Sequence, residues 1–329
     1  GKSRAENVRM PRVMQYNATL QQQLSKDFSV SVGYVGNSGR HVFNGDGPNF
    51  NVNQEAFIPG VANANLRKPF FTRFGWDQGI DHYCNCATNQ YHSLQATADK
   101  RFSNGLSFNW NYTLQKAVGD DGDSFTFLYN RPLGRGNRDN IQRHQMVWAP
   151  TFEIPIGRGR KFGANMNRAL DAAIGGWTMS GITTFYAGRP FTPFIGNIPA
   201  SAVRPNAGPS NRPDAGSADV YAGAAGDRTG FYVGCPNGIV GCQTFGLPAN
   251  NQFGNLEIRS LFGPKFINQD MSLAKTFQAT EKYRFSLRAE AFNAFNHSNL
   301  GDPEGNLTSP SVGKIFGLAP SYTMRRMQF

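Results

Sequence analysis

The stretch that decides the fold is Leu106–Leu114, which reads Leu-Ser-Phe-Asn-Trp-Asn-Tyr-Thr-Leu. Its large apolar and aromatic side chains alternate strictly with serine, asparagine and threonine. Because successive side chains of a β-strand point to opposite faces, this alternation predicts a strand with one apolar and one polar face. The predicted apolar face carries Leu106, Phe108, Trp110 and Tyr112.

The same alternation recurs along the chain. In residues 283–291, aromatic and aliphatic side chains alternate with charged and hydroxyl side chains, and residues 27–34 repeat the pattern. Weaker versions occupy residues 12–24, 91–102, 141–156, 177–189, 268–278 and 322–329. The sequence thus predicts about nine strands of roughly 8–14 residues, which are longer than the usual strand of about 5–6 residues.

The connections between the predicted strands alternate in length. Short ones include residues 25–26 and 279–281, and the Asn104-Gly105 pair is typical of a two-residue hairpin loop. The long connections are residues 44–90, 118–140 and 190–267. Since alternate connections of an up-and-down sheet lie at opposite ends, the short turns gather at one end and the long loops at the other. This asymmetry is typical of outer-membrane barrels, which have short periplasmic turns and long extracellular loops.

The sequence therefore predicts an all-β fold, an antiparallel up-and-down transmembrane β-barrel with long extracellular loops. This chain would supply about nine or ten strands of a larger barrel, because plugged transporters use about 22. The predicted lipid-facing side chains are Leu106, Phe108, Trp110, Tyr112, Phe285 and Leu287. The predicted lumen-facing polar side chains are Arg284, Arg288 and Glu290. A soluble β-sandwich would show the same period, and the loop asymmetry favours the barrel.

Composition narrows the function classes. The chain has 329 residues, a net charge of +11, 37 glycines, 19 prolines and 27 phenylalanines, which favours strands and turns over a helical bundle. It contains no run of 18 apolar residues, so we predict no transmembrane helix. The basic residues are scattered, which argues against nucleic acid and favours anionic lipid or lipopolysaccharide as the partner. No nucleophile or P-loop motif occurs, so an enzyme is the least supported class.

The four cysteines form two close pairs whose C-x-C and C-x6-C spacings do not match common zinc sites. For Cys235 and Cys242 we predict a loop disulfide in an oxidising compartment. A direct bond between Cys84 and Cys86 would be strained, so free thiols or other partners stay open for this pair.

Two polar clusters fall in the long connection 118–140. Asp120, Asp121 and Asp123 offer hard oxygen ligands for Ca²⁺, but the loop lacks the EF-hand spacing and its closing glutamate. We therefore interpret it as a solvated loop and predict no metal and no cofactor. The arginines of the same connection are hypothesised to contact lipopolysaccharide phosphates, and they are Arg131, Arg135 and Arg138.

Several stretches resemble TonB-dependent receptors of the Oar-like type, and they occur in the order of that family. The similar segments are residues 91–95 (YHSLQ), 100–107 (KRFSNGLS), 143–144 (RH), 152–159 (FEIPIGRG), 175–182 (GGWTMSGI), 188–191 (GRPF), 204–206 (RPN) and 288–297 (RAEAFNAFNH). The family also carries a signal peptide, a carboxypeptidase-regulatory-like domain, a TonB box and a plug, and this sequence resembles only its C-terminal barrel portion. Family chains end with a longer strand, and residues 326–329 resemble only its beginning. We therefore expect further residues after this sequence, as well as the family's other domains before it.

The resemblance implies a location in the bacterial outer membrane. It implies that the whole protein binds or transports an unknown extracellular ligand, energised by the TonB complex through the plug region absent here. Residues 44–90 and 190–267 would be the main ligand-contacting loops. Two alternatives stay open. One is a structural envelope scaffold without transport, and the other is a soluble extracellular β-sandwich that binds glycan through Phe70, Phe71, Phe74 and Trp76.

Overall fold

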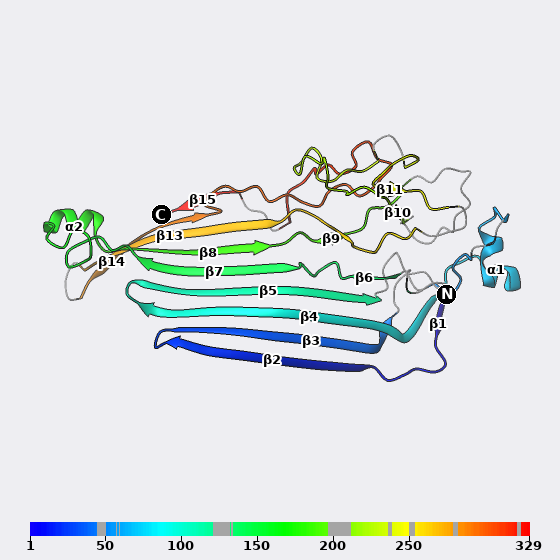
Figure 1. Ribbon diagram of the computed structural model, residues 1–329, viewed down its shortest axis with the longest axis horizontal. Helices are drawn as coiled ribbons and strands as arrows, with labels where there is room; N and C mark the ends of the chain where they lie inside the picture. Colours follow the sequence, from blue (N-terminus) through cyan, green and yellow to red (C-terminus); the bar gives the residue numbers. More distant parts are fainter. Residues whose placement is uncertain are drawn as a thin grey trace.

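The computed structural model describes the chain apart from residues 45–50, 57, 59, 121–131, 133, 197–211, 236–238, 250–253, 279–281 and 321–323. One large sheet dominates it, with the strand order β15-β14-β13-β8-β7-β5-β4-β3-β2 (Figure 1). These nine strands are β2 (Arg12–Ser25), β3 (Phe28–Asn44), β4 (Asp81–Ser103), β5 (Leu106–Asp120), β7 (His144–Glu153), β8 (Trp177–Tyr186), β13 (Phe266–Gln278), β14 (Arg284–Phe292) and β15 (Arg326–Gln328). They pair antiparallel, as predicted, and the short β6 (Arg135–Asn137) adds to β5 beyond β7.

The remaining elements are small. β1 (Lys2–Arg4) pairs in parallel with the start of β4. Two short strand pairs join β9 (Pro190–Phe191) to β12 (Leu261–Phe262), and β10 (Asp214–Ala215) to β11 (Phe245–Gly246). The helices are η1 (Asn65–Arg67), α1 (Pro69–Phe74) and α2 (Arg168–Ile174). Among the described residues, no helix is long and apolar enough to cross a membrane.

The two ends of the sheet differ as the connection lengths predicted. Figure 1 shows α2 and the strand turns at one end, here called the turn end, and α1 with the long connections at the opposite, outer end. The β4–β5 turn is the two-residue loop Asn104-Gly105, and both residues have positive φ angles, 52° and 77°. Such angles are required by a type I′ hairpin, which matches the right-handed twist of its strands.

The predicted boundaries of the first long loop were wrong. β3 continues to Asn44 and β4 begins at Asp81, so the connection spans residues 45–80 and not 44–90. Near the outer end the β3 ladder contains a bulge, where His41 adopts a φ of 55°. The sequence could not mark this extension because its polar and apolar residues do not alternate there, and the backbone ladder alone continues the strand.

The register aligns the apolar side chains of all nine strands. Trp110 of β5 lies opposite Ala98 of β4 and Trp148 of β7. Residues directly opposite in an antiparallel pair share a face, so the alternation of each strand adds to that of its neighbours. The resulting apolar face includes Leu20, Val32, Leu94, Ala96, Ala98, Leu106, Phe108, Trp110, Tyr112, Trp148, Phe152, Met179, Leu273, Phe285, Leu287 and Met327.

The opposite, polar face is equally continuous. It includes Gln21, Ser31, Thr97, Asn109, Asn111, Thr151, Ser180, Ser272, Arg284, Arg288, Glu290 and Gln328. The apolar face is open in the described chain, whereas the outer part of the polar face is buried at Ser93 and Gln115. Phe285 and Leu287 on the apolar face are 63% and 51% exposed, and Trp110 is half-buried. A soluble β-sandwich would bury this face against a second sheet, so that alternative was wrong.

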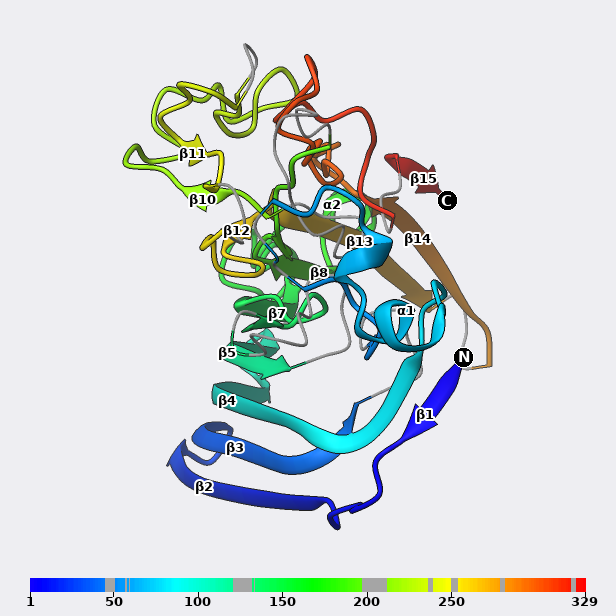
Figure 2. The same cartoon turned by 90° about the vertical axis from the view of Figure 1, so that its right-hand side faces the viewer.

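The sheet is curved. Viewed from the outer end, the strands follow an open arc from β2 through β5 and β7 to β14 (Figure 2). β2 and β15 are the two edges of the arc. The α1 segment lies on the hollow side of the arc, close to β1.

One buried lysine fixes the turn end. The Nζ atom of Lys275, on β13, donates hydrogen bonds to the carbonyl oxygens of Asp171 and Ala172 in α2, at 2.9 and 2.6 Å. Lys275 is 6% exposed, and its Nζ lies 4.9 Å from the ring centroid of Phe277 and 5.8 Å from that of Trp177. Because the last carbonyls of a helix carry partial negative charge, this cation stabilises α2 against the sheet.

We expect Lys275→Met to loosen α2 while leaving the sheet intact, because it keeps the aliphatic stem and removes the donor. The Asp171 carbonyl keeps the hydrogen bond from the Gly175 amide, but the Ala172 carbonyl loses the ammonium donor. Such a loss costs about 1–3 kcal/mol, so amide hydrogen exchange in residues 168–176 should accelerate about tenfold or more. The matched control is Lys161→Met in the same turn, since Lys161 is exposed. Equal exchange in the two variants would contradict this role of Lys275.

Candidate functional site

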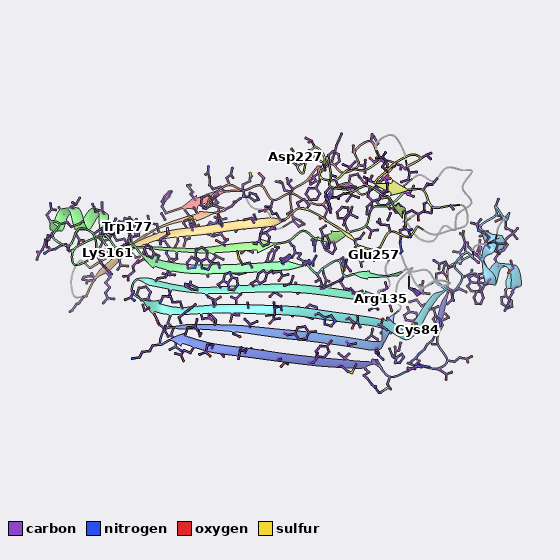
Figure 3. All side chains as sticks on the ribbon, in the orientation of Figure 1. Cys84, Arg135, Lys161, Trp177, Asp227 and Glu257 are labelled. Atoms are coloured by element: carbon purple, nitrogen blue, oxygen red, sulfur yellow. A yellow bond between two sulfur atoms is a disulfide. The ribbon has the colours of Figure 1, made fainter. Side chains whose placement is uncertain are left out.

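Two surfaces of this chain are candidates for function: the outer part of its apolar face and the folded loops beyond it. Figure 3 shows Lys161 and Trp177 at the turn end, and Cys84, Arg135 and Glu257 at the outer end.

An aromatic band crosses the apolar face near the outer end. The hydroxyl of Tyr34 lies 2.6 Å from Nδ1 of His92, and the hydroxyl of Tyr112 lies 2.8 Å from Nδ1 of His144. The ring of Tyr16 stacks on Tyr34 with centroids 6.1 Å apart. Aromatic rings with a polar tip are typical of the membrane–water interface, where one end is apolar and the other is wet.

A glycine makes this packing possible. Tyr16 lies opposite Gly36, and a Cβ atom at Gly36 would come within 2.0 Å of Cε2 of the tyrosine ring. The ring therefore covers the glycine backbone and reaches toward His92 on the next strand, with ring centroids 6.4 Å apart. An aromatic ring over a glycine also fixes the register of two paired strands.

Beyond the aromatic band, one row of residues across the strands carries most of the charged side chains at the outer end of the apolar face. We call it the outer arginine row, and it consists of Arg12, Arg40, Thr88, Asp120 and Arg135. Oδ2 of Asp120 accepts hydrogen bonds from the Thr88 hydroxyl at 2.8 Å and the Thr88 amide at 3.2 Å. Nη1 of Arg135 lies 3.3 Å from Oδ1 of Asp120.

This geometry bears on the acidic cluster considered for Ca²⁺. Asp120 lies on β5, where Thr88 and Arg135 occupy its oxygens, and Asp121 and Asp123 lie outside the described residues. Within the described ranges, no group of three or more histidine, cysteine, aspartate or glutamate residues has a metal-binding arrangement. Of the loop arginines, Arg135 lies on β6, Arg138 follows it, and Arg131 lies outside the described residues.

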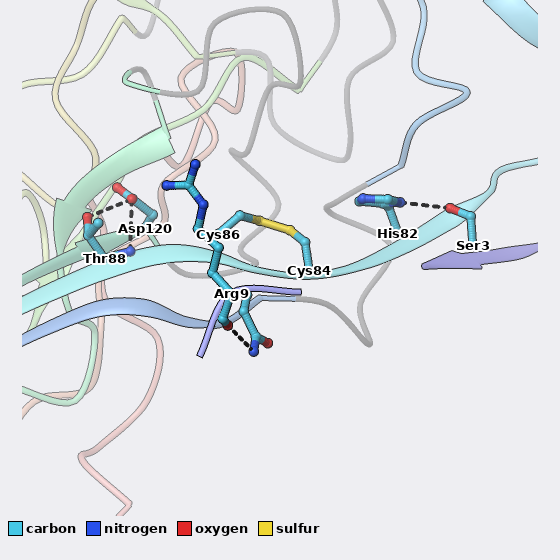
Figure 4. Close-up of a disulfide and its surroundings, with 8 residues drawn as sticks. Ser3, Arg9, His82, Cys84, Cys86, Thr88 and Asp120 are labelled. Atoms are coloured by element: carbon cyan, nitrogen blue, oxygen red, sulfur yellow. Dashed lines mark hydrogen bonds between the residues drawn. A yellow bond between two sulfur atoms is a disulfide. The ribbon is translucent and has the colours of Figure 1, made fainter. Parts of the chain in front are cut away.

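The cysteine pair on β4 lies next to this row. The structure joins Cys84 to Cys86, two residues apart in sequence, and neither thiol is therefore available as a ligand (Figure 4). His82 is engaged as well, since its Nδ1 lies 2.9 Å from the Ser3 hydroxyl. The Ser3–His82 contact joins β1 to the start of β4, whereas the disulfide lies within β4.

The charged residues predicted for the lumen lie on the polar face of β14. Nη1 of Arg288 lies 3.2 Å from Oε1 of Glu290, and Gln328 of β15 donates to the same carboxylate. Arg284 lies opposite Gln278 at the turn end. The apolar side chains of β14 occupy the opposite face, as described above.

The long connections contain a folded unit that the alternation did not predict. This loop module comprises residues 190–196, 212–235, 239–249, 254–264 and 299–320. Its buried apolar cluster consists of Ile195, Tyr232, Cys235, Ile239, Phe245, Leu256, Leu261, Leu307 and Val312. A disulfide between Cys235 and Cys242 lies at this cluster. Residues from two different connections thus share one core, as β9, β12 and the 300–320 segment come together.

Hydrogen bonds hold the loop module together and to the sheet. The Phe194 amide donates to the Gly305 carbonyl at 2.9 Å, and the Leu307 amide donates to the Phe194 carbonyl at 2.8 Å. The side chain of Asn299 both accepts from and donates to the backbone of Ile267 on β13, at 2.7 and 2.9 Å. The module is therefore hydrogen-bonded to the sheet at its outer end.

Two ionisable groups in the module are strongly influenced by burial. Burial raises the pKa of Tyr232 well above its usual range, and its hydroxyl donates to the Glu304 carbonyl at 2.7 Å. Burial lowers the pKa of Arg212 to about 10, so this guanidinium stays charged at neutral pH. A cavity of about 320 Å³ adjoins the disulfide and is lined by Ala218, Val233, Cys235, Cys242 and Thr244.

A second, smaller lobe is built around α1. Asn53 is fully buried, and its side chain donates to the carbonyl oxygens of Trp76 and Gln78 at 2.9 and 2.8 Å. Arg67 forms a buried ion pair with Glu55 at 2.7 Å. These contacts support an exposed aromatic surface, on which Phe74 is 72% and Trp76 47% exposed.

The sequence missed the shared core of the loop module and the outer arginine row. A cluster of apolar residues in a Gly- and Pro-rich connection was one available signal for the core. No signal in the sequence could align Arg12 with Arg40 and Arg135, because only the register brings these three strands into one row.

Comparisons with known proteins identify the family. Residues 2–328 match the outer membrane beta barrel domain family. No curated protein matches the chain. Among solved structures, the chain is similar to the outer membrane transporter YddB from Escherichia coli, with 10% sequence identity and a TM-score of 0.45. That match covers 98% of this chain and 32% of the transporter, so this chain spans about a third of that protein's length. The chain belongs to the outer membrane beta barrel domain family, and its predicted location in the bacterial outer membrane is confirmed.

Proposed function

We propose that this chain forms part of the barrel wall, together with the ligand-contacting outer loops, of a TonB-dependent outer-membrane receptor of the Oar-like type. The observation that supports this proposal most strongly is the continuous apolar face of nine strands, with a polar face behind it and a folded loop module at one end. The proposal includes no catalytic step.

In this proposal the apolar face contacts lipid. Leu106, Phe108, Trp110 and Tyr112 on β5 belong to it, as do Phe285 and Leu287 on β14. A face of this size and exposure requires an apolar solvent, because its burial is favourable by about 25 cal/mol per Å². The polar face, which carries Arg284, Arg288 and Glu290, lines the wet interior.

The open edges require further strands. Unpaired backbone groups at β2 and β15 would cost several kcal/mol each in the hydrocarbon core, so only a closed barrel is stable there. We infer that strands from other segments of the whole protein, or from partner chains, pair with these two edges. A plug region and the TonB complex would then supply the moving part and its energy.

The loop module and the α1 lobe are the proposed ligand-contacting surfaces. Long loops held on a rigid scaffold commonly carry binding function, and both lobes are ordered by buried polar or apolar groups. The exposed rings of Phe74, at the end of α1, and of Trp76 offer stacking surfaces for a ligand. The ligand is expected to be extracellular and too large or too scarce for passive entry.

We predict that an arginine on the apolar face destabilises the membrane-embedded protein far more than one on the polar face. Ala98 and Thr97 are neighbours on β4 that face opposite sides. Ala98→Arg should cost about 2–4 kcal/mol near the bilayer midplane, and Thr97→Arg should cost less than about 1 kcal/mol. Urea unfolding of the whole protein in lipid vesicles measures both variants. A larger cost for Thr97→Arg would reverse the assignment of the faces.

We predict that a cavity-forming substitution in the core of the loop module unfolds the module and leaves the barrel intact. Phe245 is fully buried, and Phe245→Ala should cost about 3–5 kcal/mol in the module. Limited proteolysis on intact cells should then cleave residues 212–264, while heat-modifiable gel migration of the protein stays unchanged. The matched control is Phe316→Ala, because Phe316 is 68% exposed. Loss of heat-modifiable migration in Phe245→Ala would show that the module and the barrel fold as one unit.

The TonB assignment is tested with the whole protein purified from outer membranes in detergent. The immobilised periplasmic domain of TonB from the same bacterium should capture it, and an unrelated outer-membrane barrel should pass through. A structural scaffold without transport would pass through as well, so absence of capture would favour that alternative.

A further inference from the structure

The outer arginine row contains two cations that face each other across a strand pair. Arg12 of β2 and Arg40 of β3 are direct register partners, and both side chains are exposed. Within the described part of the chain, neither forms an ion pair with a carboxylate. Like charges directly opposite on one face destabilise a sheet. A bound anion would therefore stabilise this pair of arginines.

The one described carboxylate of the row, that of Asp120, does not neutralise these two arginines. Asp120 is engaged by Arg135 and Thr88. Lys116 is exposed and lies opposite His92, at the level of the aromatic band. The outer part of the apolar face thus carries four basic side chains and one paired carboxylate.

The row lies at the height of lipid headgroups. Arg12 is four residues beyond Tyr16 on the same face of β2, which is about 13 Å along a strand at about 3.3 Å per residue. A strand tilt of about 40° reduces this to about 10 Å along the membrane normal. Since aromatic girdles flank the apolar band at the membrane interface, guanidinium groups about 10 Å farther out lie among the headgroup phosphates.

We propose that Arg12 and Arg40, assisted by Arg135 and Lys116, bind the phosphate groups of lipopolysaccharide in the outer leaflet. Guanidinium groups bind phosphate oxygens through two parallel, charge-assisted hydrogen bonds, and two opposed arginines would share one phosphate or bind a neighbouring pair. Binding offsets their mutual repulsion and fixes the β2 edge region of the wall to its lipid shell. The inference rests on the proposed contact of the apolar face with lipid.

The test uses the whole protein purified from outer membranes in mild detergent. Native mass spectrometry counts the lipopolysaccharide molecules retained, and thermal unfolding measures the response to added lipid A. The double variant Arg12→Ala/Arg40→Ala should retain about tenfold less lipopolysaccharide than the wild type. The double variant Arg12→Lys/Arg40→Lys keeps the charge and should retain more than the alanine variant.

The matched control removes two arginines from the opposite face of the same sheet, as Arg284→Ala/Arg288→Ala. It should retain as much lipopolysaccharide as the wild type, because these side chains face away from the lipid. Equal retention in the Arg12/Arg40 alanine variant and the wild type would overturn the proposal. An equal loss in the control would also overturn it, since net charge alone would then explain the effect.

Added lipids identify the source of the phosphate. Bisphosphorylated lipid A should raise the unfolding temperature of the wild type, whereas dephosphorylated lipid A and inorganic phosphate should not. An equal rise with dephosphorylated lipid A would assign the site to acyl chains, and an equal rise with inorganic phosphate would assign it to free anions. Either result would overturn the proposal. Capture by TonB is unaffected by these outcomes, so failure here is distinguishable from failure of the transport assignment.

Discussion

The structure depends on the register of one antiparallel ladder. A shift of one residue between two strands would move the whole apolar set of one strand to the polar face. The two-residue turn Asn104-Gly105 fixes the pairing of β4 with β5, and the Tyr16 ring over Gly36 fixes that of β2 with β3. As a result, nine strands that alternate independently present a single apolar surface.

The sheet and the loops bury their apolar side chains in different ways. The sheet has no apolar core of its own, because its large side chains cover an exposed face that the membrane would bury. In the proposed arrangement the loop module stands outside the membrane, and it forms a core from few residues. It does so by combining two distant connections around Phe245 and Leu307 and by adding the Cys235–Cys242 disulfide. Small extracellular units commonly need such a covalent constraint.

The distribution of charge along the apolar face also fits a membrane-facing surface. Its basic side chains lie toward the two ends of the strands. At the turn end, Lys100 pairs with Asp27 at 2.6 Å, and Lys275 binds the end of α2. The hydrogen bond from Lys100 is the largest cause that holds the pKa of Asp27 well below its usual range. At the outer end lie Lys116 and the outer arginine row. The apolar stretch between the two ends suits the hydrocarbon layer.

The sequence by itself determined the main strands, the two faces and the ends of the sheet, but not the short strands β1 and β6. Alternation in segments such as Leu106–Leu114 reflects an environment that differs between the two sides, and that difference is recorded residue by residue. The outer continuation of β3 and β4 escaped prediction because their polar and apolar residues do not alternate there. Only the tertiary structure decided which distant residues meet. The opposition of Arg12 and Arg40 depends on the bulge between Gln23 and Ser25, which sets the register of the β2–β3 hairpin. The shared core of Ile195 and Leu307 arises from segments far apart in the chain, and no local pattern encodes such contacts.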